Sequence, residues 1–233
     1  MYPLKIFIIA GEVSGDLLGG AILRAMTGQT TRRLDVRGIG GDGIKSGGMR
    51  TSLFPMHELS VMGIAEIIPK IPHFLRRIRE TVDAIEGFKP DLIITIDSPD
   101  FCFRVQQKLR LRGNLRGAKQ IHVVAPSVWA WRPGRAEKIS KFLDGLVCFF
   151  PFEPPYFEKY GLRSMSMGHP AINAPSATAD PAQLRKTLDI KPDDITLGLY
   201  LGSRAGVVER HAPLFIAAVN MLAQTHKNIR VLI

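Results

Sequence analysis

Acidic and hydroxyl side chains gather at a corner near the start of the chain, directly after the apolar run of residues 6–10. Gly11 ends this run, and Glu12, Ser14 and Asp16 open a helical pattern. In open α/β sheets, ligands bind beyond the carboxyl ends of the strands, where helix N-termini offer unpaired N–H groups. Two carboxylates would repel a pyrophosphate, so we interpret Glu12 and Ser14 as ligands for sugar hydroxyls. The alternative is a turn without a ligand, in which Ser14 caps the helix and Asp16 complements its positive end.

Apolar runs that alternate with helical patterns must position these residues. Buried strands are predicted at residues 6–10, 34–39, 91–97, 120–125 and 146–150. Such runs, separated by helices, are typical of a doubly wound parallel sheet in an α/β protein. Asp97 then lies at the carboxyl end of a strand, which is where ligands bind in this architecture.

A glycine-rich segment follows the second predicted strand. Residues 38–43 match the pattern G-x-G-x-x-G, which marks a dinucleotide site when a helix begins at the motif. Here Ser46 is followed by two glycines, and no helical period starts. We therefore predict a flexible loop at this position and no dinucleotide fingerprint.

Residues 59–75 form a segment that is apolar nearly all round. Pro69 and Pro72 are expected to interrupt any single helix there, because proline lacks the N–H that a helix interior needs. A buried helix is the first interpretation. The alternative is a surface that contacts acyl chains, with the arginines behind it contacting lipid phosphates. These are Arg76, Arg77 and Arg79.

A second α/β unit is predicted near the end of the chain. Residues 173–182 are rich in Pro, Ala and small polar residues, which indicates a linker. A strand at residues 195–201, a turn, a helix at residues 207–225 and a strand at residues 229–233 follow. We thus predict an N-terminal domain at residues 1–172, a linker at 173–182, and an incomplete Rossmann-like domain at 183–233.

Composition and charge narrow the functional class. With 45% hydrophobic and 22% charged residues, the chain is typical of globular proteins, and no apolar run has the length of a membrane span. The N-terminal run lacks the features of a signal peptide, so a cytoplasmic protein is expected. Cys102 and Cys148 have no metal-binding spacing, and we expect two core thiols, no metal and no cofactor.

Positive charge is concentrated in one stretch. The chain has a formal net charge of +10, and residues 101–141 contain ten Lys or Arg against one acid, Glu137. Such local excess suits a phosphorylated ligand, an anionic membrane surface or a nucleic acid. A solvated helix face is the alternative, although a balanced face would interleave acidic residues. The stretch predicts salt-sensitive binding to anionic vesicles.

Eight short motifs occur along the chain in an order that resembles the lipid-A-disaccharide synthase family. They are GEVSGDLLG (11–19), ELSVMGIAE (58–66), KPD (89–91), IDSPDF (96–101), PSVWAWR (126–132), PFE (151–153), GHP (168–170) and GSR (202–204). The resemblance implies a two-domain glycosyltransferase of the GT-B type. The second domain of that fold would be truncated here, because family members continue well beyond residue 233.

The resemblance also implies a reaction and a location. Family members transfer 2,3-diacylglucosamine from its UDP donor to the 6-hydroxyl of 2,3-diacylglucosamine 1-phosphate, with inversion. The products are the β-1,6 lipid A disaccharide 1-phosphate and UDP. The enzyme is peripheral to the inner face of the inner membrane, so its partners are the UDP donor, the phosphorylated lipid acceptor and an anionic membrane surface.

The residues suit an inverting transfer, which needs a base for the acceptor proton and positive groups for the diphosphate. Asp97 is the candidate base, and a turn cap is its structural alternative. Ser203 and Arg204 are candidate substrate-binding residues, since a guanidinium makes bidentate phosphate contacts. The chain departs from the family pattern near both sites, with Leu201 in place of proline and Cys102 in place of asparagine.

Two other classes of function compete with the enzyme. A non-catalytic module that binds membrane surfaces or phospholipids would use the basic stretch and the apolar residues 59–75. A nucleic-acid binder is the third hypothesis, but no nucleic-acid motif accompanies the charge, so we expect no nucleic-acid partner.

Overall fold

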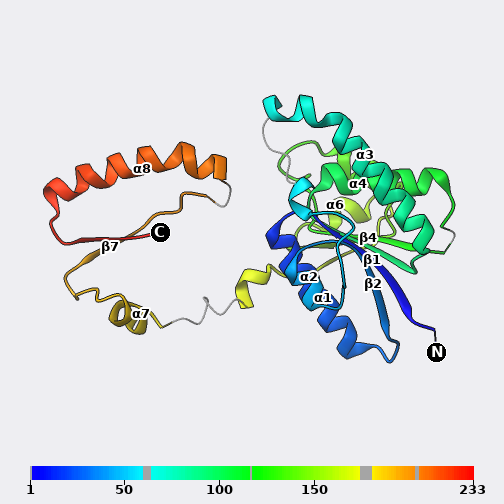
Figure 1. Cartoon of the computed structure of the whole chain (residues 1–233), viewed down its shortest axis with the longest axis horizontal. Coiled ribbons are helices and arrows are strands. Elements are labelled where there is room, and N and C mark those ends of the chain that lie inside the picture. The colour runs from blue at the N-terminus through cyan, green and yellow to red at the C-terminus, as the bar shows by residue number, and fades with distance from the viewer. Residues whose placement is uncertain (1, 60–63, 116, 174–179, 203–204) are drawn as a thin grey trace. The chain divides into compact units, whose positions relative to one another are not determined.

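The computed structural model describes residues 2–59, 64–115, 117–173, 180–202 and 205–233. The chain divides into two compact units, residues 1–172 and 173–233 (Figure 1). The first contains the candidate base and the basic stretch.

A parallel sheet forms the centre of the first unit. Its described part has six strands in the order β2-β1-β3-β4-β5-β6. They are β1 (Leu4–Ala10), β2 (Leu34–Ile39), β3 (Leu92–Ile96), β4 (Lys119–Val123), β5 (Gly145–Cys148) and β6 (Ser164–Ser166). The sequence predicted β1 to β5 and missed β6. The strand order reverses between β1 and β3, which makes their carboxyl ends the switch point where ligands bind in such folds.

Helices cover both faces of this sheet (Figure 1). They are α1 (Val13–Gln29), α2 (Asp42–Ser46), α3 (Ile64–Phe88), α4 (Pro99–Arg112), α5 (Gly134–Ser140) and α6 (Pro155–Glu158), with 3₁₀ turns η1 (Met56–Leu59) and η2 (Pro170–Asn173). On one face, Ile9 and Ile93 pack with residues of α3 and α4. On the other, Ile8 and Ile94 pack with α1 and α2. The doubly wound sheet is therefore confirmed.

The glycine-rich segment differs from its prediction as a flexible loop. The helix α2 begins at Asp42, and the buried carboxylate of Asp16 lies against its first turn. This carboxylate accepts backbone N–H bonds from Gly41 at 2.7 Å, Gly43 at 2.8 Å and Ile44 at 3.0 Å. The backbone N–H groups that could bind an anion at this helix N-terminus are thus bound to the protein's own carboxylate.

Asp16→Asn should destabilise the first unit by about 2–3 kcal/mol, because an amide cannot accept all three N–H bonds and its NH₂ group would face a buried donor. Urea unfolding followed by circular dichroism measures the loss. Asp42→Asn is the matched control, since the Asp42 side chain is fully exposed and, among the described residues, pairs only with Lys45 at 3.2 Å. Equal stability of the two variants would contradict a structural role for Asp16.

The helix α3 runs without interruption over Ile64–Phe88 and includes both Pro69 and Pro72. The prediction that these prolines interrupt a single helix is therefore wrong. The side chains of residues 60–70 lie outside the described part, so the choice between core and lipid surface is open for them. Beyond them, Ile71 and Leu75 are each more than two fifths exposed, whereas Ile78 is fully buried.

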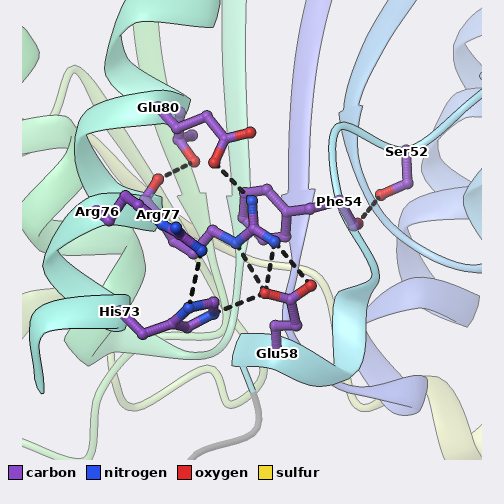
Figure 2. A network of polar contacts seen from close by, with 8 residues as sticks. Ser52, Phe54, Glu58, His73, Arg76, Arg77 and Glu80 are labelled. Carbon is purple, nitrogen blue, oxygen red and sulfur yellow. Dashed lines mark hydrogen bonds and ion pairs between the residues drawn. The ribbon is translucent and has the colours of Figure 1, made fainter. Parts of the chain in front are cut away.

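A polar network ties α3 to η1, as Figure 2 shows. The guanidinium of Arg77 donates to both oxygens of Glu58, at 2.7 and 2.8 Å, and to Glu80 at 2.6 Å. Burial acts to raise the pKa of Glu58, but hydrogen bonds from Arg77 and His73 outweigh it and hold this pKa below its ordinary value. Arg77 also lies over the ring of Phe54. Its guanidinium is therefore engaged in contacts within the protein, which favours a structural role over the predicted contact with a lipid phosphate.

The second unit contains a two-stranded parallel sheet. Its strands, β7 (Ile195–Gly198) and β8 (Ile229–Leu232), are joined through α8 (Ala205–Thr225). A short helix, α7 (Pro181–Thr187), precedes them, and the carboxylate of Asp180 caps it by accepting the Ala182 N–H at 2.9 Å. The helix thus begins inside the predicted linker at 173–182.

Candidate functional site

The corners after β1 and β3 are in direct contact at the switch point of the sheet. Gly11 is buried, and a Cβ atom at this position would lie 2.2 Å from the Oγ of Ser98. Only glycine fits there. The structure thereby brings the corner that carries Glu12 against the corner that carries Asp97, although the two are distant in sequence.

The backbone at the second corner is held in an unusual conformation. Asp97 has φ 52° and Ser98 has φ 43°, both in the left-handed region that non-glycine residues seldom adopt. Ser98 is the N-cap of α4, and Asp97 stands just before it, partly exposed. Such conformations cost free energy and are concentrated at functional sites. This backbone conformation supports Asp97 as a candidate functional residue.

Cys102 lies behind this corner, in the first turn of α4. Its side chain is fully buried. Burial raises the pKa of the Cys102 thiol, and the nearby carboxylate of Asp97 raises it further. Burial likewise raises the pKa of Cys148, to about 12. Both thiols therefore stay protonated, as expected of core residues, and within the described ranges no cluster of His, Cys, Asp and Glu could hold a metal ion.

The remaining sequence-predicted residues have different outcomes. Glu12 is the N-cap of α1, and its backbone is extended. Ser14 lies inside the first turn of the helix with its side chain exposed, so the interpretation of Ser14 as the cap is wrong. Its role as a sugar ligand stays a prediction. Ser203 and Arg204 lie outside the described residues.

A carboxylate that the sequence did not single out organises the same edge of the sheet. Glu153 is buried and accepts the backbone N–H groups of Phe149 at 3.1 Å and Phe150 at 2.9 Å. The indole N–H of Trp129 donates to it at 3.4 Å. Glu153 thus joins the turns that follow β4 and β5. The PFE motif was the one sequence feature that could have pointed to Glu153. A glutamate in a predicted loop, however, gives no indication that its side chain is buried.

Half-exposed aromatic rings surround this carboxylate. Phe150 and Phe152 are stacked with ring centroids 5.5 Å apart, and Trp129 meets Phe152 edge to face at 5.4 Å. The ring of Phe149 lies 4.8 Å from that of His169, which follows β6. These residues form an apolar surface at the carboxyl edge that also carries Asp97, and apolar side chains there could contact a lipid or the face of a sugar ring.

A histidine lies buried between α4 and the sheet. The Nδ1 atom of His122 lies 2.7 Å from the hydroxyl of Thr95, and its Nε2 atom has no hydrogen-bond partner in the described chain. Burial lowers the pKa of His122 to about 3, with the positive charge of Arg135 as a smaller cause. The ring is therefore neutral at physiological pH.

Acidification should destabilise the protein through His122. The pKa of His122 in the folded protein, about 3, lies below its ordinary value of 6.5. Between these two pH values, His122 is protonated in the unfolded chain but not in the folded protein. Stability present above pH 6.5 is then lost as the pH falls, by at most about 1.4 kcal/mol per pH unit. Unfolding free energies measured across this range should fall more steeply for the wild type than for His122→Gln. Parallel curves would contradict this assignment.

The basic stretch is partly neutralised by acids from elsewhere in the chain. Arg110 pairs with Asp144 at 2.8 Å, and Arg112 pairs with Asp83 at 2.7 Å and Glu86 at 2.9 Å. The count of one acid within the stretch therefore overestimates its free charge. Other cations of the stretch, including Arg104 and Lys138, form no ion pair or hydrogen bond within the described part of the chain.

The sequence matches a known family over nearly its whole length. A family model described as lipid-A-disaccharide synthetase matches residues 6–233. The chain belongs to this family. The lipid-A-disaccharide synthase of Rhodospirillum centenum is 42% identical over 100% of the chain, and that of Ruegeria pomeroyi is 45% identical over 99%. The chain spans only 57% and 56% of the length of these relatives.

Solved structures confirm the fold class. The Staphylococcus aureus protein MnaA, determined with UDP, aligns with 99% of the chain at a TM-score of 0.61, over 61% of its own length. At 14% sequence identity this likeness shows the fold alone. The α/β, GT-B-like class predicted for the family is therefore confirmed.

Proposed function

We propose that the chain is the acceptor-side portion of a glycosyltransferase of lipid A biosynthesis. It would act in transfer of 2,3-diacylglucosamine from its UDP donor to 2,3-diacylglucosamine 1-phosphate. The observation that carries the proposal is the family match over residues 6–233, with the candidate base at the switch point of the sheet. The products are the β-1,6 lipid A disaccharide 1-phosphate and UDP.

In this mechanism Asp97 is the general base. Its carboxylate accepts the proton of the acceptor's 6-hydroxyl as that oxygen attacks the anomeric carbon of the donor. The new glycosidic bond forms on the face opposite the diphosphate, the bond to the diphosphate breaks, and UDP leaves with the electron pair. Attack from the opposite face inverts the anomeric carbon, and a positioned base accelerates such a step by about 10²–10⁴-fold.

Other residues position the substrates in this proposal. Glu12, which directly follows Gly11 at the corner that contacts Ser98, binds sugar hydroxyls together with Ser14. Ser203 and Arg204 bind the diphosphate of the donor. Support for them comes from sequence, because the GSR motif follows β7 and precedes the long helix α8, a position where phosphates are bound in α/β folds.

The domain organisation belongs to the same proposal. Residues 1–172 form the acceptor-side domain, 173–182 the linker, and 183–233 the start of the nucleotide-sugar-binding domain. The division into units at residue 172 supports the first boundary.

We place the protein in the cytoplasm, peripheral to the inner face of the inner membrane, where its lipid acceptor would lie. No helix in the described ranges is both long and apolar enough to cross a bilayer. Support for peripheral binding comes from Arg104 and Lys138, which have no ion-pair partner in the described chain, and from the exposed apolar side chains of α3.

A chimera tests the activity. This chain would supply the part of the protein that it matches, and the Ruegeria pomeroyi relative would supply the remainder. Purified chimera incubated with UDP-diacylglucosamine and radiolabelled diacylglucosamine 1-phosphate should form the disaccharide. A folded chimera that forms no disaccharide, beside an active intact relative, would refute the proposed function.

A further inference from the structure

A groove with a volume of about 610 Å³ lies between α4 and α5. It extends from Pro99 and Asp100, at the start of α4, to Leu111 at its end. Its volume is within the range of small-molecule sites. The residues assigned to the transfer reaction do not line it.

The charge of this α4–α5 groove is strongly positive. Five of its lining side chains are Lys or Arg, and Asp100 is its one acidic lining residue in the described chain. Two of the cations, Arg110 and Lys141, are engaged by Asp144 and Glu137. The three that remain are Arg104, Arg135 and Lys138, so positive charge in excess of Asp100 faces the groove.

The floor of the groove is apolar. Phe103, Ile139 and Phe142 line it, and each is largely buried. The guanidinium of Arg135 lies 5.3 Å from the centre of the Phe103 ring, so one cation is held directly over this floor. At the far end Leu111 lines the groove and is 79% exposed. An apolar floor beneath a cationic rim suits an amphiphile that carries negative charge.

We propose that the α4–α5 groove binds one anionic phospholipid of the membrane surface. Its phosphate contacts Arg104, Arg135 and Lys138, and part of an acyl chain lies along Phe103 and Leu111. Charge complementarity favours an anionic head group over a zwitterionic one, and the apolar floor favours a lipid over free phosphate or nucleic acid. The inference rests on the proposed peripheral location but does not depend on the transfer reaction.

Vesicle binding by the 233-residue chain tests this site. The wild type should co-float with mixed phosphatidylglycerol–phosphatidylcholine vesicles and not with pure phosphatidylcholine vesicles. The double substitution Arg104→Glu/Lys138→Glu should weaken binding to the anionic vesicles by about tenfold or more, since each basic residue near such a surface contributes substantially. Leu111→Ser should reduce the binding that persists at high salt, where exposed charges are screened.

The matched control is Arg33→Glu/Arg50→Glu. It changes the net charge equally, both side chains are exposed, and neither lines the groove. We expect a loss of less than about threefold, because charge outside the groove acts only through the screened surface field. Circular dichroism would check that each variant is folded.

The possible results distinguish a failure of the groove proposal from a failure of the proposed peripheral location. If the wild type does not bind anionic vesicles, both the peripheral location and this site are refuted. Equal losses in the two double variants would refute the groove alone. If Arg104→Glu/Lys138→Glu lost binding to duplex RNA but kept its binding to anionic vesicles, the occupant would be a nucleic acid and the proposal would be overturned.

An NMR titration tests whether a single lipid binds in the groove. Monomeric dihexanoyl phosphatidylglycerol should shift the amide signals of α4 and α5 more than glycerol phosphate does. Equal shifts would refute a lipid bound in the groove.

Discussion

Asp97→Asn should lower the rate of disaccharide formation by the chimera by about 10²–10⁴-fold. The amide has the shape of the carboxylate but cannot accept the proton of the acceptor hydroxyl. The fold should be unaffected, because the backbone N–H of Asp97, which donates to the carbonyl of Val123 at 3.0 Å, is unchanged by the substitution. Initial rates at saturating substrates, beside thermal unfolding, measure both effects.

Asp100→Asn is the matched control for this variant. Asp100 is exposed in the first turn of α4, three residues after Asp97. Its substitution by Asn removes the same charge from the same corner. It should retain activity within about tenfold, because a nearby charge contributes less than a group that transfers the proton. Asp97→Asn with activity within tenfold of the wild type would exclude Asp97 as the base.

A polypeptide of these 233 residues, assayed without any further segment, should bind a phosphorylated lipid acceptor and yet transfer sugar far more slowly than the chimera. Transfer requires that both substrates be held together, and loss of that positioning removes about 7–11 kcal/mol of barrier reduction. The described residues beyond 173 offer the donor a two-stranded sheet and two helices, and Leu214 and Met221 of α8 remain exposed. UDP therefore has few partners there.

Turnover of the two proteins under identical conditions, with UDP binding followed by calorimetry, measures this difference. Acceptor binding by the 233-residue polypeptide shows whether its first unit is intact. Near-equal turnover would mean that the donor site is built from residues other than those assigned here. Tight UDP binding without turnover would place the defect in acceptor positioning.

Local sequence was sufficient for most of the sheet. Residues 34–39 form β2 as predicted, and the runs behind β1, β3, β4 and β5 were located to within a few residues, because continuous apolar segments have few alternatives to a buried strand. The strand β6 was missed, since Ser164–Ser166 is short and polar and forms only by pairing with β5. Its pattern alone does not distinguish it from a loop.

Prolines and charges were judged less well from sequence. The expectation of a break at Pro69 and Pro72 followed from local propensity, but α3 continues through them. Likewise, the acids that neutralise Arg110 and Arg112 lie in the bend just before β5 and in α3, outside the basic stretch, so a local count could not include them. Packing overrides propensity because tertiary contacts contribute more free energy than a single residue's preference.

The sequence by itself determined the fold class, the family and the position of Asp97 after a buried strand, because these depend on local pattern and on motif order. Only the tertiary structure decided that Gly11 meets Ser98, that Asp16 fills the N-terminus of α2, and that Arg104 and Lys138 share a groove. Each of these contacts joins segments far apart in the chain. Their partners are selected by strand order and helix packing, which no single stretch of sequence specifies.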